Sequence, residues 1–342
     1  MCGLSREGRS KLTPLSAAAA RAFDEIPSDP APATLIRRSH YWAGNERSLY
    51  LCHQAVARRR GAYLGVGSDQ NYLLAGWARS EFATVVDFDQ GVVDLHRCYH
   101  SLFRHAATAA EFVACWSDEA RERTSGLLAD EHERPDGARI GRAFRMAQPL
   151  VWERLLELRR LQKRYQMASF VDDAEQYDHI RQLVCSDRFV VVRGDFAGDA
   201  TMPALAQALR GADLRLGVVY LSNVEQYLEY TPTFRRNMLA LDVLDDAVVV
   251  RTLGWKVFGY APGEQYHYNV QGAPAFAAWL RYSEVRRLPD LLRFRTKTVE
   301  RGLSVLDRAP DPSLPRPEIA EPIEAPDDDD DRLHEAEPIV AE

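Results

Sequence analysis

The chain has 342 residues, of which 46% are hydrophobic, so it can bury a large core within one sizeable domain. The net charge of −7 arises near the end, because residues 311–342 hold twelve Asp or Glu against two Arg and the rest is close to neutral. A near-neutral body argues against nucleic acid as the default partner, and no stretch is long and apolar enough to span a bilayer.

Cysteine usage and the first residues indicate the compartment. The five cysteines are scattered without a CxxC pair, which favours neither a disulfide framework nor a zinc site. The beginning of the chain lacks the apolar region of a signal peptide. Together these features predict a cytoplasmic protein.

The composition divides the chain into three parts. Residues 1–33 are expected to form a short lead and residues 34–306 the folded domain, beginning with a mostly helical stretch over residues 39–60. Residues 307–342 are proline-rich and acidic, and such a tail cannot bury enough apolar surface to fold alone. Its expected role is solubility or contact with a basic protein partner or cleft.

A glycine turn is the strongest local pattern. The apolar run over residues 62–66 predicts a strand that reaches Gly65 and Gly67, and a polar turn with Asp69 leads into a helix from about Asn71. Glycine permits positive φ angles and a close approach of ligand to backbone. The following helix N-terminus favours a polar or anionic group at the same place.

A second strand, predicted over residues 82–86, ends on Asp87, twenty residues after Gly67. An acid at this distance can accept hydrogen bonds from two ribose hydroxyls, which predicts a nucleoside-bearing ligand. A dinucleotide fingerprint would need glycine where the chain has Gln70, which weakens an NAD interpretation. The alternative is a strand pair whose glycines serve packing alone.

A helix is predicted after the second strand, and it leads into a long helical insertion. The segment over residues 92–103 has a helical apolar face and carries His96 and His100 at the i, i+4 spacing of a metal pair. Without a third ligand or an HExxH acid, surface or cofactor-contacting histidines are preferred and no metal is predicted. The helical pattern then continues over residues 106–182, which exceeds an ordinary crossover and predicts a helical insertion that selects substrate.

The third and fourth strands are predicted over residues 189–192 and 214–221, with a helix over residues 202–210 between them. Asp195 follows the third strand, where a carboxylate can accept the amino group of adenine. Its alternative is an ordinary Gly-Asp turn.

Polar residues follow the fourth strand, where chemistry occurs in open α/β sheets. Asn223 can orient a substrate amine or hydroxyl, Glu225 can accept its proton, and Tyr227 can wall the pocket. Alternatively, Ser222 or Asn223 caps the next helix, with Glu225 in its first turn.

The remaining elements close the sheet. A helix is predicted over residues 234–241 and a strand over residues 247–251. Two short alternating segments, residues 255–260 and 265–270, predict an antiparallel hairpin at one edge of a parallel sheet. Residues 275–306 are predicted to be helical.

Three motifs, VGSDQNYLLAGWA, VVDFDQGVVDLHRCYHSLF and VVYLSNVEQYL, resemble a bacterial family related to class I S-adenosylmethionine-dependent methyltransferases. The resemblance implies an α/β fold with a Rossmann-like methyltransferase sheet, mostly parallel with a closing antiparallel hairpin. It also implies that Gly65 and Gly67 contact the methionine end of the cofactor, Asp87 the ribose and Asp195 the adenine, with Asn223 at the catalytic strand end. Asp69 is a further candidate for cofactor binding in the turn.

Three functions follow as hypotheses. The first is a methyltransferase that binds S-adenosylmethionine and places a nucleophile of unknown identity through Asn223 and Glu225. The second is a non-catalytic binding or regulatory protein, which a cleft plugged by Tyr63 or Gln70 would favour. The third is an NAD-dependent oxidoreductase, for which the sequence offers no nicotinamide site.

Overall fold

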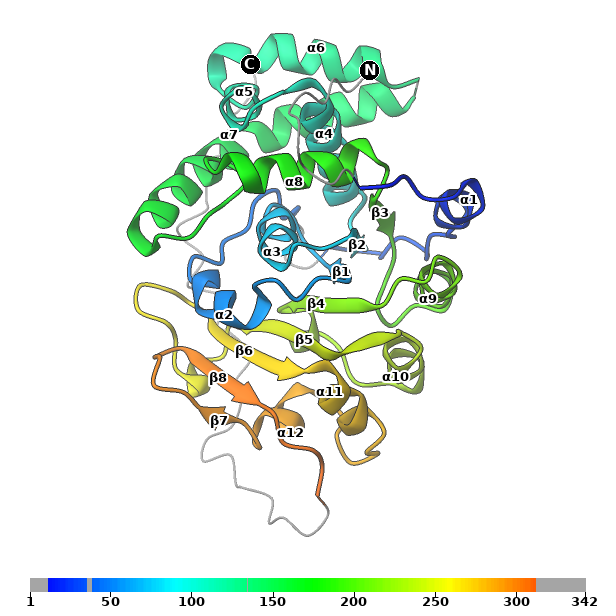
Figure 1. The fold of residues 1–342 in the computed structure, drawn as a ribbon, viewed down its shortest axis with the longest axis vertical. Helices are drawn as coiled ribbons and strands as arrows, with labels where there is room; N and C mark the ends of the chain where they lie inside the picture. The colour runs from blue at the N-terminus through cyan, green and yellow to red at the C-terminus, as the bar shows by residue number, and fades with distance from the viewer. Residues whose placement is uncertain (1–11, 36–38, 134, 312–342) are drawn as a thin grey trace.

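The computed structural model describes residues 12–35, 39–133 and 135–311. Residues 312–342 of the predicted acidic tail lie outside these ranges. One sheet runs through the molecule, with helices packed on both of its faces (Figure 1).

The sheet has eight strands in the order β3-β2-β1-β4-β5-β6-β8-β7. The first five pair in parallel, β6 is antiparallel to β5, and β8 is parallel to β6 and antiparallel to β7. The chain therefore has an α/β fold built on a mostly parallel mixed sheet. The strands are β1 (Ala62–Gly65), β2 (Phe82–Asp87), β3 (Phe189–Arg193), β4 (Leu216–Ser222), β5 (Val243–Leu253), β6 (His267–Gly272), β7 (Thr296–Lys297) and β8 (Leu303–Leu306).

The central strands are buried on both sides, which is why their sequences are continuous apolar runs rather than alternating ones. Successive residues still face opposite sides: Tyr63 packs into one core and Leu64 into the other. The Tyr63 side of the sheet is covered by α3 (Gln70–Ala78), α4 (Gln90–His105), α7 (Asp136–Tyr165) and α8 (Ala174–Cys185). The other side is covered by α1 (Ala17–Asp24), α9 (Thr201–Gly211), α10 (Pro232–Leu239), α11 (Ala273–Leu280) and α12 (Leu288–Leu292).

Helices fill the described part of the chain between β2 and β3. After α4 come α5 (Ala109–Ala114), α6 (Arg121–Glu131), α7 and α8. Figure 1 shows α5, α6 and α7 gathered at the end of the molecule opposite β7 and β8. Trp116 and Phe144 pack here at 5.1 Å between ring centroids, so this end shares the core of the Tyr63 face.

The five predicted parallel strands and the helices that begin at Gln70, Gln90, Thr201 and Pro232 are confirmed to within a few residues. Their apolar periodicity is a local property, and burial in the sheet reinforces it.

The prediction of a mostly helical segment over residues 39–60 is wrong. This stretch is largely irregular and holds only a 3-10 turn (Leu49–Cys52) and the short α2 (His53–Val56). Its backbone N–H groups bond to carboxylates from distant parts of the chain: that of Gly44 donates to Asp69, and those of Arg47 and Ser48 donate to Glu264. These acceptors replace the carbonyls of a helix.

The hairpin predicted over residues 255–270 is also misplaced. The antiparallel pair consists of β5 and β6, and the connection between them holds a 3-10 turn, Lys256–Phe258. Trp255 and Phe258 are buried in the core from this turn rather than from a strand. Gly259, at φ +77°, ends the turn.

Residues 275–306 are only partly helical. After α11 and α12 the chain forms β7 and β8, and β8 extends the sheet beside β6. Gly302 has φ +86° and admits no side chain, because a Cβ would meet the backbone N of Ala261 at 2.2 Å. The turn before β8 thus depends on a close backbone approach.

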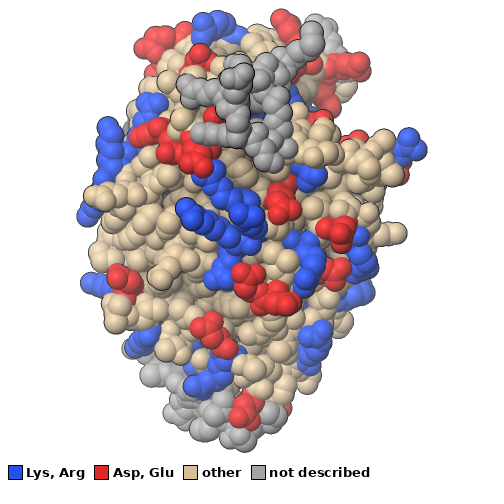
Figure 2. Space-filling view, viewed as in Figure 1, with Lys and Arg blue, Asp and Glu red and all other residues tan. Residues whose placement is uncertain are grey.

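Charge is mixed over the surface that Figure 2 presents. Acidic and basic side chains are interspersed across this face, and neither sign forms one continuous surface there.

Candidate functional site

A cavity of about 370 Å³ lies at the carboxyl ends of β1, β2, β3 and β4. We call it the strand-end cavity. Its described lining comes from the turns after these four strands, from the first turns of α3 and α4, from residues 30–35 and from Tyr266. It also includes residues 39–45 of the stretch over residues 39–48, which we call the 39–48 segment. A volume of this size is typical of small-molecule sites, and the location is the usual ligand site of open α/β sheets. The predicted site residues that line it are Gly67, Asp87, Asp195, Asn223 and Tyr227.

Gly67 has φ +81°, so the turn after β1 needs glycine for its backbone conformation. Asn71 holds this turn by donating from its amide nitrogen to the carbonyls of Val66, Gly67 and Ser68 at 3.0, 3.1 and 2.9 Å. The turn is therefore a fixed wall of the cavity.

Gly65 is a glycine for a different reason. It does not line the cavity, and a Cβ there would lie 2.0 Å from Oδ1 of Asn71 and 2.6 Å from the hydroxyl of Tyr63. Those two atoms also hydrogen-bond each other at 2.8 Å. The structure thus assigns Gly65 to packing, the alternative that the sequence left open.

Asp87 is buried at the cavity wall. Its two carboxylate oxygens accept backbone N–H groups from Gly67 at 3.1 Å and from Asp89 at 2.8 Å. Burial raises the pKa of Asp87 to about 7, and the nearby Asp89 charge adds to the rise. Each oxygen keeps a further lone pair, so the carboxylate can still accept hydrogen bonds from a ligand.

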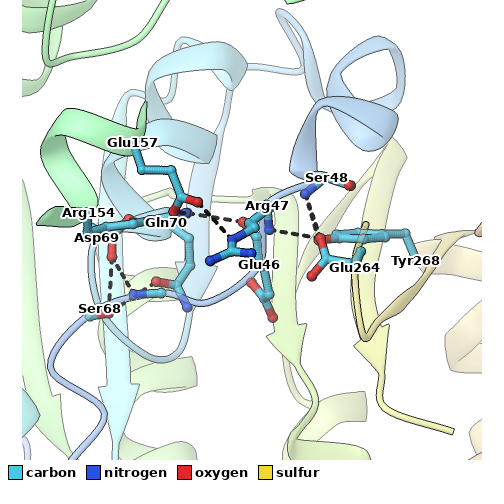
Figure 3. A network of polar contacts seen from close by, with 11 residues as sticks. Glu46, Arg47, Ser48, Ser68, Asp69, Gln70, Arg154, Glu157, Glu264 and Tyr268 are labelled. Atoms are coloured by element: carbon cyan, nitrogen blue, oxygen red, sulfur yellow. Dashed lines mark hydrogen bonds and ion pairs between the residues drawn. The ribbon is translucent and has the colours of Figure 1, made fainter. Parts of the chain in front are cut away.

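Asp69 does not reach the cavity. It is 0% exposed and pairs with Arg154 of α7, whose Nε lies 2.9 Å from Oδ2. Arg154 also donates to Glu157 at 2.8 Å and to the carbonyl oxygen of Glu46 at 3.0 Å (Figure 3). Asp69 therefore joins the helices between β2 and β3 to the glycine turn, rather than contacting ligand.

The same network fixes the 39–48 segment (Figure 3). Arg47 pairs with Glu157 at 2.7 Å. Glu264 accepts the N–H groups of Arg47 and Ser48, each at 2.8 Å, and the hydroxyl of Tyr268 at 2.7 Å. One wall of the cavity is thus held from both α7 and the chain that leads into β6.

Asp195 lies at the cavity and is exposed, with its Oδ1 accepting the N–H of Ala197 at 2.8 Å. This is the Gly-Asp turn that the sequence offered as the alternative, and it leaves carboxylate lone pairs available. The carboxylate of Asp29 fixes the backbone of this turn, because it accepts the N–H groups of Asp195 and Ala200 at 3.0 and 2.9 Å.

Asn223 lines the cavity directly after β4, and its side chain makes no capping bond to the 3-10 turn that follows, Val224–Gln226. The preceding Ser222 has φ +46°, a strained conformation for a residue with a side chain. The sharp turn brings both residues to the cavity.

Glu225, predicted as a proton acceptor, is instead part of a buried ion pair. Its Oε2 lies 2.5 Å from Nε of Arg251, and its Oε1 accepts the Tyr230 hydroxyl at 2.5 Å. Both charged side chains are fully buried, and Glu225 is not among the lining residues. Tyr227, by contrast, lines the cavity as predicted.

The sequence did not predict the roles of two acidic residues near the cavity, Glu46 and Asp89. Glu46 is buried beneath the strand ends, where it accepts hydroxyl hydrogens from Ser222 at 2.7 Å, from Thr252 at 2.6 Å and from Tyr220. Burial raises the pKa of Glu46, and the three hydroxyls limit the rise. No local pattern marks Glu46, because its partners lie far along the chain.

The second of these acids, Asp89, pairs with His40. Nδ1 of His40 lies 2.7 Å from Oδ2 of Asp89, which lines the cavity and caps α4 through the N–H of Gly91. The only local pattern that indicated a role for Asp89 was its position as an acid at the N-cap of α4.

His96 and His100 do not form a metal site. His96 is buried, with Nε2 at 2.8 Å from the carbonyl of Gly67 and Nδ1 at 2.7 Å from the hydroxyl of Tyr72, and burial lowers its pKa to about 4. It braces the glycine turn as a neutral ring. In residues 12–35, 39–133 and 135–311 no group of three or more His, Cys, Asp or Glu could hold a metal ion.

Acidic side chains contribute to the described lining of the strand-end cavity. The carboxylates of Asp87, Asp89 and Asp195 face the strand-end cavity, together with the rings of Tyr41 and Phe88, among others. No lysine or arginine occurs among the lining residues that the structure describes. The three carboxylates favour a neutral or cationic ligand over an anionic one.

These observations define a class: an α/β protein with a small-molecule cavity at the carboxyl ends of its parallel strands. More particularly, the chain belongs to the family described as domain of unknown function DUF7790, whose model matches residues 41–307. The matched range takes in every strand of the sheet and the 39–48 segment from Tyr41 onward. A search of curated proteins finds no significant match. None of the helices in the described ranges has the length and hydropathy that a membrane span requires.

Proposed function

We propose that the protein is a methyltransferase that uses S-adenosylmethionine as methyl donor. The observation that carries the proposal is the strand-end cavity itself: it has the size of a small-molecule site and a buried acid after β2, and its described lining holds three carboxylates without a lysine or arginine. The order 3-2-1-4-5 of the first five strands supports a Rossmann-like sheet, although dinucleotide-binding proteins share this order.

The charge of the lining supports this donor over other nucleosides. S-adenosylmethionine carries a sulfonium and an ammonium group and no phosphate. NAD and ATP carry phosphates, which proteins hold with cations or with a glycine-rich turn at a helix N-terminus. The described lining offers such a turn at Gly67 but no lysine or arginine. The three carboxylates would repel phosphate groups. This argues against the NAD-dependent oxidoreductase that the sequence left open.

Four of the lining residues have roles in the proposed complex. Asp87 accepts the ribose hydroxyls on its remaining lone pairs, Asp195 accepts the adenine amino group, and Gly67 lets the backbone approach the methionine end. Asn223 orients the nucleophile. Gly65, Asp69 and Glu225 lie outside the lining and have no ligand contact in this proposal.

The donor supplies an activated methyl group, so the chain mainly has to hold two reactants in line. Rigid walls serve that purpose. The glycine turn is fixed by Asn71 and His96, and the 39–48 segment is fixed by Arg154 and Glu264 (Figure 3).

A second candidate is a non-catalytic binding protein with a methyltransferase-like sheet. It is favoured by Gln70, whose amide packs on the glycine turn: a Cβ at Gly67 would lie 2.8 Å from Nε2 of Gln70. The methionine end of a donor would have to share this space. The remaining volume of about 370 Å³ argues that the cavity is not plugged.

The test is a calorimetric titration of the full chain with S-adenosylmethionine and S-adenosylhomocysteine, with NAD and ATP as controls. Selective binding of the two methionine nucleosides is expected. At a ligand concentration a hundredfold above Kd, the free energy of unfolding should rise by about 2.7 kcal/mol. Binding of NAD or ATP instead, or of no nucleoside, would reject the methyltransferase proposal.

Mixed surface charge on the face in Figure 2 fits a small-molecule substrate better than nucleic acid.

A further inference from the structure

We propose that the end of the strand-end cavity beyond β4 binds an amine, which accepts the methyl group. We call this region the acceptor end; it is lined by Tyr41, Ser222, Asn223, Tyr227 and Tyr266. The inference rests on the proposed function, because it names the substrate class of that same site.

The order of strands separates the acceptor end from the nucleoside end. Asp195 follows β3 and Ser222 follows β4, and these strands are three places apart in the sheet. With about 4.8 Å between neighbouring strands, the two ends lie roughly 14 Å apart along the sheet. A donor that reaches from Asp195 past Gly67 would therefore present its reactive end near β4.

The hydrogen bonds of Ser222 favour a donor group on the substrate. Its hydroxyl hydrogen is given to the buried carboxylate of Glu46 at 2.7 Å. Toward a ligand Ser222 can then act only as an acceptor. An amine or ammonium N–H can bond to it, whereas a carboxylate or phosphate oxygen cannot.

Aromatic rings supply the second argument. Tyr41 and Tyr227 are 41% and 43% exposed and line the same cavity as Tyr266. The Tyr266 ring is held in place because its hydroxyl accepts the side-chain N–H of Asn45 at 2.8 Å. Tyrosine faces attract ammonium groups. Three such rings at the acceptor end favour an ammonium group over an anion.

The chemistry balances without a further reactant. The substrate ammonium first releases a proton to solvent and becomes a free amine. The amine nitrogen then bonds to the methyl carbon, while the carbon–sulfur bond breaks with its electron pair left on sulfur. The products are a methylated ammonium and a neutral thioether. The same tyrosine faces that hold the substrate can hold the charged product.

The experiment compares two ligands of the same shape. The full chain is titrated by calorimetry with choline, whose quaternary ammonium stands in for the methylated product, and with its neutral carbon isostere 3,3-dimethylbutan-1-ol, each with and without S-adenosylhomocysteine. Choline is expected to bind at least tenfold more tightly than the isostere. Equal affinities, or binding of neither compound, would overturn the inference.

Variants test whether the tyrosine rings cause the preference for choline over the isostere. Tyr227→Leu should weaken choline at least fivefold and leave the isostere unchanged, whereas Tyr227→Phe, which keeps the ring, should stay within twofold of wild type. The matched control is Tyr165→Leu, since Tyr165 stacks on Tyr50 away from the strand-end cavity. Melting curves check that all variants fold. Choline binding that is indifferent to Tyr227→Leu would contradict the assigned wall.

The same titrations separate the two proposals. Binding of S-adenosylhomocysteine without preference for choline would reject the amine and leave the methyltransferase standing. Preference for choline without binding of S-adenosylhomocysteine would reject the methyltransferase and leave a cation site.

Discussion

The acids near the carboxyl edge of the sheet fall into two groups. Asp69 and Glu225 are fully buried against arginines, whereas Asp87 and Asp195 border the strand-end cavity with no arginine partner among the described residues. Asp87 is the last residue of β2, and the other three follow a strand within a few positions. The comparison teaches that position after a strand does not decide whether an acid can bind ligand. What decides it is whether a buried cation already occupies the carboxylate.

The largest expected effect comes from breaking the arginine-paired group. Glu225→Ala leaves Arg251 buried without a counter-charge, so the free energy of unfolding should fall by about 3–5 kcal/mol. Chemical denaturation followed by circular dichroism measures it. The double variant Glu225→Leu with Arg251→Met removes both charges and should recover most of the loss. If the Glu225→Ala protein has normal stability but cannot transfer methyl groups, Glu225 is a catalytic residue and not a structural one.

The second pair should affect both stability and binding. Arg154→Met removes the partner of Asp69 and the bond to the 39–48 segment, so a loss of about 3 kcal/mol in stability and weaker binding of S-adenosylmethionine are expected. Arg139→Met is the control, because Arg139 of the same helix is partly exposed and pairs with Asp94 away from the cavity; it should cost about 1 kcal/mol or less. If both variants bind the nucleoside equally well, Arg154 does not position the cavity wall.

The cavity group should affect binding more than folding. Asp87→Asn is expected to weaken S-adenosylmethionine by about 1.5–3 kcal/mol, since hydrogen bonds to a charged acceptor are lost. Calorimetry measures the affinity, and a melting curve controls for the fold. Unchanged affinity would remove Asp87 from the ribose site.

The pH dependence sharpens the assignment of Asp87. Because burial raises its pKa to about 7, the carboxylate is mostly protonated at pH 6, and affinity for S-adenosylmethionine should rise about tenfold from pH 6 to pH 8. Asp87→Asn should lack this rise. A wild-type affinity that stays flat over this range would contradict an ionised ribose acceptor.

The raised pKa of Asp87 also predicts how the free energy of unfolding depends on pH. The folded pKa of Asp87 exceeds the ordinary value of 3.8, so the folded state binds the extra proton. The stability that Asp87 contributes is therefore present below about pH 4 and is lost as the pH rises through about 7. The difference in unfolding free energy between wild type and Asp87→Asn, measured across this range, should follow that sign.

The smallest effect is expected at Asp195. Its carboxylate is exposed, so Asp195→Asn should weaken S-adenosylmethionine by about 0.5–1.5 kcal/mol and barely change stability. Asp199→Asn, in the same loop and paired with Arg236 on the surface, is the matched control. Equal affinities for the two variants would place adenine elsewhere.

Much of the fold was predictable from the sequence. Continuous apolar runs marked the five parallel strands, and helical periodicity marked α3, α4, α9 and α10. The predictions failed where the backbone bonds to distant side chains, as in residues 39–60, or where an apolar residue is buried from a turn, as at Trp255. Local patterns carry no information about such partners.

The candidate site was half predictable. Gly67, Asp87, Asp195 and Asn223 reach the cavity because strand ends and tight turns are local features that place the next few residues at one edge of the sheet. Gly65 looked equivalent to Gly67, yet it packs against Tyr63 and Asn71. Gly65 is the last residue of β1, whereas Gly67 lies in the turn beyond the strand at φ +81°, so two glycines in one motif met different surroundings.

By itself, the sequence determined the order of strands and helices along the chain and the positions where polar residues follow strands, because periodicity and turn chemistry act over a few residues. Only the tertiary structure decided which acids remain open to a ligand. Asp69 meets Arg154 across 85 residues, and Glu46 meets Ser222 across 176. Such pairs form because the fold buries them together and buried charges need partners, a condition that no short stretch of sequence reveals.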